Sequence, residues 1–150
     1  MLFTWEILLH QILLVLLLVS SSIISILINQ ADLSGPKKIT LFRFINGFNK
    51  AIVLPAALFL LIANVWGIAQ TEYINVQNVS ARFFMGLTGL ITLGVSAFQI
   101  TPLTNEGISE LKRKSITGSK YQKIFQKLRT AFITIMLTVA ASYWLAYLFR

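Results

Sequence analysis

The sequence predicts an all-α integral membrane protein, a four-helix bundle that forms one transmembrane domain over residues 1–150. Composition is the first reason: 56% of the residues are hydrophobic and 12% are charged, with a mean hydropathy of +0.75. Soluble domains carry about 25% charged residues. The second reason is that apolar stretches long enough to cross a bilayer, about 20 residues, recur along the chain with polar connections between them.

The first two spans are expected at residues 2–28 and 52–69. The first is N-terminal, but it lacks the basic start and the small-residue cleavage site of a signal peptide, so we expect it to remain in the protein. The second carries Pro55 in its first turn, where the missing N–H of proline costs little.

The third and fourth spans are expected at residues 83–100 and 131–149. Pro102 follows the third span and is expected to end its helix, because the residue before a proline is disfavoured in helical conformation. Tyr143 and Trp144, near the end of the fourth span, are typical of the aromatic belt at a membrane–water interface.

Charged residues in the connections predict the orientation of the bundle. Connections 29–50 and 102–130 are rich in lysine and arginine, whereas the connection between them in the chain, residues 70–82, carries Arg82 and Glu72. Basic connections are retained in the cytoplasm. We therefore expect loops 29–50 and 102–130 to be cytoplasmic and both termini to lie outside, in a bacterial inner membrane or an equivalent membrane.

Composition also bears on several classes of function. The chain has no cysteine, so disulfides, thiolate catalysis and cysteine-ligated metals are excluded. The net charge of +8 comes from the connections between apolar spans, where it serves orientation rather than nucleic-acid binding. We therefore expect the lipid bilayer, and no nucleic acid, as a partner.

Hydroxyl side chains recur every four residues in the last two spans. They form one stripe on each helix: Thr88, Thr92 and Ser96 on the third, and Thr130, Thr134, Thr138 and Ser142 on the fourth. In lipid, small polar residues let helices approach closely, so the stripes predict that the third helix packs on the fourth. The alternative is a hydrophilic path between the two helices, but no ionisable group lies in either stripe.

The segment before the fourth span shows helical periodicity. Its apolar residues, separated by lysines, are Tyr121, Ile124, Phe125 and Leu128. One interpretation is an amphipathic segment on the inner leaflet. The other, which we favour, is an extension of the fourth helix whose charges face water. We identify no internal repeat in the sequence.

The one histidine of the chain lies early in the first span. Glu6 and His10 are four residues apart, so they share a helix face. One interpretation places both side chains in headgroups and water. The other turns His10 toward the bundle, where ionisable residues usually mark sites or pathways. A lone histidine cannot build a zinc site, and no nucleophile lies at a distinctive spacing from it. A single imidazole does suffice as an axial ligand of haem iron.

The sequence offers the minimum set of groups for a b-type haem. His10 supplies the imidazole, and Arg82 begins the third helix at the same side of the membrane, where a cation can meet the propionates. His10 and Arg82 are thus the candidate cofactor-binding residues, with His10 as the metal ligand. A second axial ligand would come from another subunit or from a weak donor.

The order of these features resembles the four-helix membrane proteins of the CopD and HemJ type. The resemblance covers residues 6–82: His10 early in the first helix, then "RFINGFNKAIVLPAALFLLIANVWGIA" at residues 43–69, in which a basic connection leads to Pro55. HemJ-like proteins are membrane protoporphyrinogen oxidases that use b haem. The resemblance implies that His10 is a haem ligand and that Arg82 stands where the family has a lysine.

Two functions stay open from the sequence. The first is a small haem-binding membrane protein with a redox role toward a porphyrin or quinone-like substrate. The second is a non-catalytic accessory or structural subunit of a larger membrane complex or of a homo-oligomer, with the basic connection 102–130 as a docking surface. A transporter is less favoured, because we see no pair of broken helices. No catalytic residue is assigned, and whether the chain is an enzyme stays open.

Overall fold

The computed structural model describes residues 2–29, 35–70, 76–113 and 118–148, and all of its regular structure is helical. Four helical rods follow one another along the chain. They consist of α1 (Leu2–Asn29), then α2 (Gly35–Phe48), η1 (Asn49–Val53) and α3 (Leu54–Ala69), then α4 (Val76–Val95), η2 (Ser96–Ile100) and α5 (Thr101–Lys112), and finally α6 (Gly118–Leu148).

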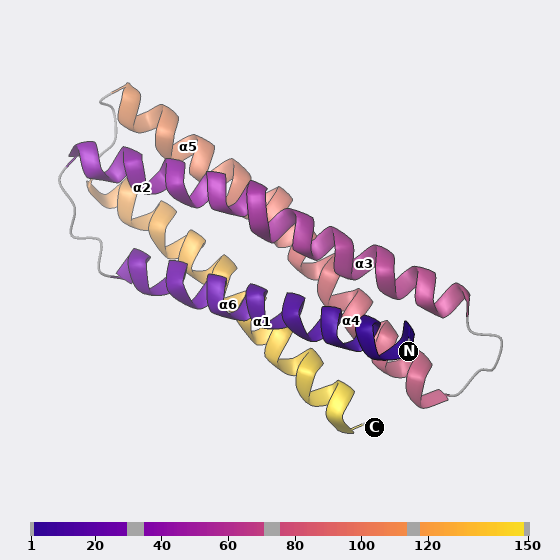
Figure 1. Ribbon diagram of the computed structural model, residues 1–150. Coiled ribbons are helices and arrows are strands. Elements are labelled where there is room, and N and C mark those ends of the chain that lie inside the picture. The colour runs from indigo at the N-terminus through magenta and orange to yellow at the C-terminus, as the bar shows by residue number, and fades with distance from the viewer. Residues whose placement is uncertain (1, 30–34, 71–75, 114–117, 149–150) are drawn as a thin grey trace.

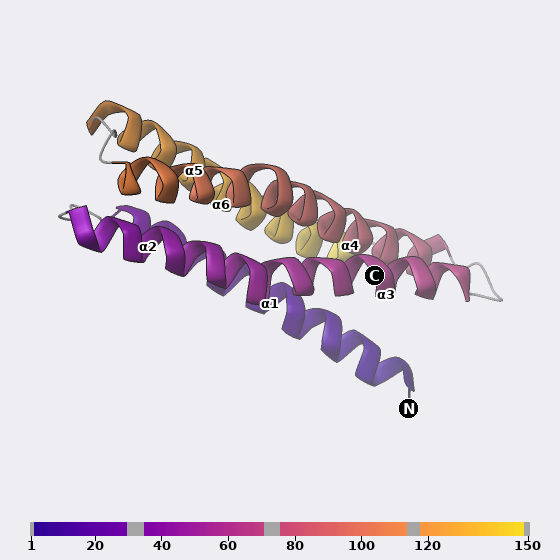
Figure 2. The ribbon, with the colours of Figure 1, turned by 90° about the horizontal axis from the view of Figure 1, so that it is seen from above.

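The four rods run antiparallel in chain order (Figures 1 and 2). Both termini lie at the end of the bundle where α3 leads to α4 (Figure 1), which we call the terminal end. The other end holds α2, α5 and the start of α6. All lysines and arginines except Arg82 and Arg150 lie at residues 37–50 and 112–129. These residues belong to α2, η1, α5, α6 and the connection between α5 and α6, so we call this end the basic end.

Each rod contains a segment long and apolar enough to cross a bilayer, which confirms the class of the fold. The candidate segments are Leu8–Ile28, Lys37–Ala69, Val79–Lys112 and Gly118–Leu145. Large apolar side chains also cover the outside of the bundle: Phe98 is 82% exposed, and Leu137 and Trp144 are each 66% exposed. Such a surface suits hydrocarbon rather than water.

The helices extend beyond the predicted spans. Most of the predicted loops 29–50 and 102–130 is helical, and Pro102 does not end a helix, so that prediction was wrong. The rod from Gly35 to Ala69 is continuous. At 1.5 Å per residue such a rod measures about 50 Å, against about 30 Å of hydrocarbon. The rod is therefore longer than the hydrocarbon is thick.

A π-helical segment explains how each long rod accommodates a proline. Pro55 and Pro102 each lie in the first turn of the α-helix that follows η1 or η2. In a plain α-helix, proline leaves a carbonyl without its N–H partner and clashes with the preceding turn. The wider π turn lets Leu54 donate to the carbonyl of Asn49 and Thr101 donate to that of Ser96.

The two π segments belong to a repeat that we did not identify in the sequence. "GFNKAIVLP", ending at Pro55, and "GVSAFQITP", ending at Pro102, share a glycine, a polar residue two positions later and the final proline. Their polar residues, Asn49 and Ser96, are 47 residues apart and touch. The same 47-residue offset relates two further contacts. Phe42 of the first rod corresponds to Gly89 of the second, and Gly107 of the second corresponds to Leu60 of the first, so the Phe42–Gly107 contact matches the Gly89–Leu60 contact. The hairpin is thus nearly twofold symmetric about Asn49 and Ser96.

An aromatic cluster fills the core at the basic end. Phe42 of α2 is fully buried, and its ring centroid lies 5.9 Å from that of Tyr121 and 4.9 Å from that of Phe125. A Cβ on Gly107 would lie 2.5 Å from Phe42 Cζ, so only glycine leaves room for the ring. Tyr121, Ile124, Phe125 and Leu128 are therefore core residues of α6, and the segment extends the fourth helix rather than lying on a leaflet.

Close packing through small residues holds the other end together. A Cβ on Gly89 of α4 would lie 2.7 Å from the backbone nitrogen of Leu61 and 2.8 Å from the carbonyl oxygen of Ala57, so the backbones of α3 and α4 touch. The predicted contact of the hydroxyl stripes is present where Thr88 of α4 hydrogen-bonds Ser142 of α6. Nearer the start of α6, the hydroxyls of Thr130 and Thr134 bond carbonyls of their own helix.

Candidate functional site

His10 lies on the face that α1 turns toward the bundle. Its side chain is 5% exposed, and it continues the buried positions Leu14, Leu17 and Ser21 at steps of three and four residues. Leu9 and Ile12, on the other faces of the helix, are 41% and 54% exposed. Of the two interpretations of the sequence, the structure favours the inward one. The side chain of Glu6 lies outside the described part of the chain.

Arg82 lies between the two helices of the central hairpin. Its guanidinium group occupies the space that a Cβ on Gly67 of α3 would fill, so a glycine at that position is what admits the arginine. Arg82 is on α4 and is partly buried. Arg82 lies in the first half of α4 and His10 in the first half of α1. Both helices begin at the terminal end of the bundle (Figure 1). The structure thus brings both candidate residues to the same end.

The most elaborate polar cluster in the described structure joins the two π segments. Ser96 Oγ donates to Asn49 Oδ1 at 2.5 Å, and Asn49 Nδ2 donates to Thr101 Oγ1 at 3.1 Å and to the carbonyl oxygen of Ser96 at 3.3 Å. Thr101 Oγ1 also donates to that carbonyl at 3.0 Å. Asn49 and Ser96 are fully buried. Each group bonds another group of the cluster, so the cluster joins helices and leaves no open polar site.

Asn49 is the site residue that the sequence analysis missed. It lies within the predicted loop 29–50, where an exposed asparagine needs no explanation. The usable signal was the polar residue six positions before each proline, Asn49 before Pro55 and Ser96 before Pro102. This shared spacing marks the repeat, but it does not show that the helix continues through each proline, because a proline usually ends a helix.

Asn64 of α3 bonds its own helix through its amide nitrogen. Nδ2 donates to the carbonyl oxygen of Leu60 at 2.7 Å, within the same helix. The residue is fully buried, and its Oδ1 has no hydrogen-bond partner among the described residues. Gly86 of α4 lies opposite, because a Cβ there would be 3.4 Å from Asn64 Cβ.

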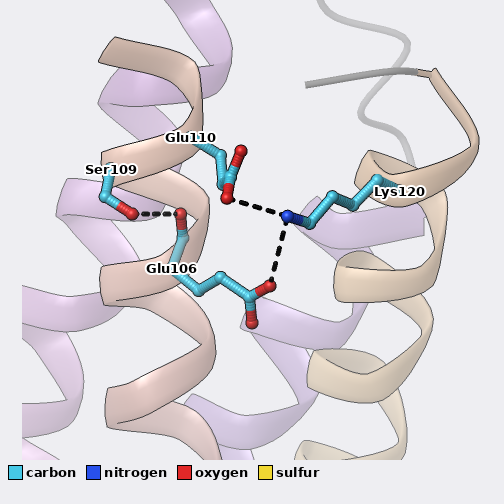
Figure 3. A network of polar contacts seen from close by, with 4 residues as sticks. All are labelled: Glu106, Ser109, Glu110 and Lys120. Carbon is cyan, nitrogen blue, oxygen red and sulfur yellow. Dashed lines mark hydrogen bonds and ion pairs between the residues drawn. The ribbon is translucent and has the colours of Figure 1, made fainter. Parts of the chain in front are cut away.

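At the basic end, the described acidic side chains converge on one lysine. Lys120 Nζ of α6 lies 2.8 Å from Glu110 Oε1 and 3.8 Å from Glu106 Oε1, both on α5 (Figure 3). Ser109 Oγ donates to the carbonyl oxygen of Glu106. Lys123, Lys127 and Arg129 of α6 are exposed. The pairing ties α5 to α6 and leaves this end strongly positive.

The described residues do not form a metal site with three or more protein ligands. No group of three or more histidine, aspartate and glutamate side chains converges there. A single imidazole, which is enough for a haem iron, is the metal-binding group that the bundle interior offers. In comparisons with known proteins, no family model, no curated protein and no solved structure matches this chain.

Proposed function

We propose that this chain is an integral membrane protein that binds a b-type haem through His10 and has a redox role. The observation that carries the proposal is the burial of His10, 5% exposed on the inward face of a membrane helix. Ionisable groups in that position usually serve a function, because their burial is costly. The resemblance to the CopD and HemJ type supports the same assignment by analogy of order and spacing.

The residues present fit the requirements of a haem. The His10 imidazole would donate a nitrogen lone pair to the iron, and the apolar positions that follow it, Leu14 and Leu17, would exclude water from that side of the site. The Arg82 guanidinium carries the positive charge that carboxylates such as propionates require. A bound haem supplies one-electron transfer chemistry, whose potential depends on its axial ligands and burial.

We also propose a sidedness for the bundle. The basic end lies in the cytoplasm of a bacterial inner membrane or an equivalent membrane, and the terminal end, with His10 and Arg82, lies near the outer face. The distribution of lysine and arginine supports this orientation. The haem would then lie close to the outer surface.

The absorption spectrum of purified protein tests the haem assignment. We expect protein from haem-replete cells to show a Soret band, and His10→Ala to remove it while the variant keeps its helical circular dichroism and its elution volume. Leu9→Ala, at an exposed neighbouring position, is the matched control and should keep the band. Colourless wild-type protein would contradict the assignment and favour an accessory subunit.

A further inference from the structure

An open groove lies between the end of α1 and the start of α2. It has a volume of about 510 Å³, within the range of ligand pockets, roughly 300–1,000 Å³, and its described lining consists of Leu27, Lys37, Thr40, Leu41 and Phe44. Phe44 is 50% exposed and Leu27 is 37% exposed, so the walls present apolar surface to the surroundings. The described helices leave these two side chains partly exposed.

Among its described lining residues the groove has one charged group, a cation. Lys37 lines it, whereas the next residue, Lys38, places its Nζ 4.1 Å from the centre of the Tyr121 ring in the core of the basic end. The described lining contains no carboxylate. The acidic side chains described nearby in the fold, Glu106 and Glu110, pair with Lys120. The groove therefore suits a molecule with an apolar body and one anionic group.

The position of the groove along the bundle indicates the source of such a molecule. Leu27 lies in the last turn of the first candidate span, Leu8–Ile28. The end of a membrane span is where hydrocarbon gives way to headgroups. Along α2, Lys37 precedes Leu41 by one helical turn and lies farther toward the basic end. The apolar walls of the groove thus lie at the level of the acyl chains of a membrane lipid, and the lysine lies at the level of its phosphate.

We propose that this groove binds an anionic phospholipid, with Lys37 against the phosphate and Leu27, Leu41 and Phe44 against the upper acyl chain. The charge of the groove selects an anionic headgroup, and its apolar walls select a lipid over a free phosphate compound. The site is separate from His10, which lies toward the other end of α1. The proposal is independent of the haem assignment.

Native mass spectrometry of the full chain in mild detergent tests the proposal. Phosphatidylglycerol and phosphatidylcholine with identical acyl chains are added in turn, and the fraction of protein that keeps one lipid is measured. We expect a preference for phosphatidylglycerol of about fivefold, since one lysine near an anionic lipid contributes about 1 kcal/mol. Lys37→Gln should remove the preference. Lys123→Gln, an exposed lysine of α6 outside the groove, is the matched control and should keep it.

Two further arms separate the groove from general attraction between charges. Phe44→Gln should lower retention of both lipids, and glycerol phosphate, which lacks acyl chains, should not be retained. Equal retention of the two lipids by the wild type would overturn the proposal, as would equal losses of preference in Lys37→Gln and Lys123→Gln. Retention of glycerol phosphate as strong as that of the lipid would also overturn it.

Discussion

Hydroxyl and amide side chains of this bundle form hydrogen bonds of two kinds. Thr130, Thr134 and Thr138 bond carbonyls of their own helix at 2.8–2.9 Å, which satisfies the hydroxyl without joining helices. Asn49 and Ser96 bond each other across two helices. The sequence shows all of these residues at suggestive spacings, but spacing alone does not distinguish a hydroxyl that bonds its own helix from one that bonds a neighbour.

Asn49→Ala should destabilise the protein more than the substitution of an exposed asparagine by alanine. The substitution removes the acceptor of Ser96 Oγ and one donor to Thr101 Oγ1, and both Asn49 and Ser96 are fully buried. A buried polar group that loses its hydrogen-bond partner lowers the free energy of unfolding by about 1–3 kcal/mol. Thermal unfolding in detergent measures the effect, with Asn105→Ala as the control, because Asn105 is exposed. Equal melting temperatures for the two variants would show that the cluster contributes little.

At the scale of elements, the central hairpin differs most from the sequence-based expectation. The apolar cores of the rods were predictable from hydropathy, as were the approximate limits of the spans at the terminal end. The helical continuation through Pro55 and Pro102 was not, because proline usually ends a helix and the π segments that tolerate it have no strong residue preference. The two copies of the repeat around Asn49 and Ser96 share few identical residues. The repeat is therefore recognised from the matching contacts rather than from the sequence.

Gly89→Ala should weaken the contact of α3 with α4. The added Cβ would lie 2.7 Å from the Leu61 backbone nitrogen, and backbone cannot move aside as a flexible side chain can. Extra atoms in a closely packed contact lower the free energy of unfolding by about 1–3 kcal/mol. Gly94→Ala is the matched control on the same helix, since its Cβ would meet nothing within 4 Å. Thermal unfolding of both variants checks the prediction, and a Gly89→Ala variant as stable as Gly94→Ala would contradict it.

At the scale of the whole molecule, composition and the recurring apolar stretches were sufficient to predict a bundle of four membrane-spanning helices. The inward orientation of His10 was not predictable, because the first span is apolar on every face and its sequence does not show which face meets the other helices. That orientation follows from the buried positions Leu14, Leu17 and Ser21, which only the packed bundle defines. The proposed sidedness still rests on the distribution of charge.

The absence of cysteine makes the sidedness directly measurable. Single cysteines at two exposed positions, Lys123→Cys at the basic end and Gln70→Cys at the terminal end, are labelled in intact cells with a membrane-impermeant maleimide. We expect labelling of Gln70→Cys in intact cells and labelling of Lys123→Cys only after lysis. The reverse pattern would invert the proposed orientation.

The central proposal is that the His10 imidazole is an axial ligand of haem iron, and chemical rescue tests it most directly. His10→Gly removes the imidazole and leaves space for a free one, so the absorption spectrum of the purified variant is recorded with and without added imidazole. We predict that the Soret band of the wild type is lost in His10→Gly and returns as imidazole is added. A Soret band of wild-type intensity in His10→Gly without imidazole would contradict the proposal.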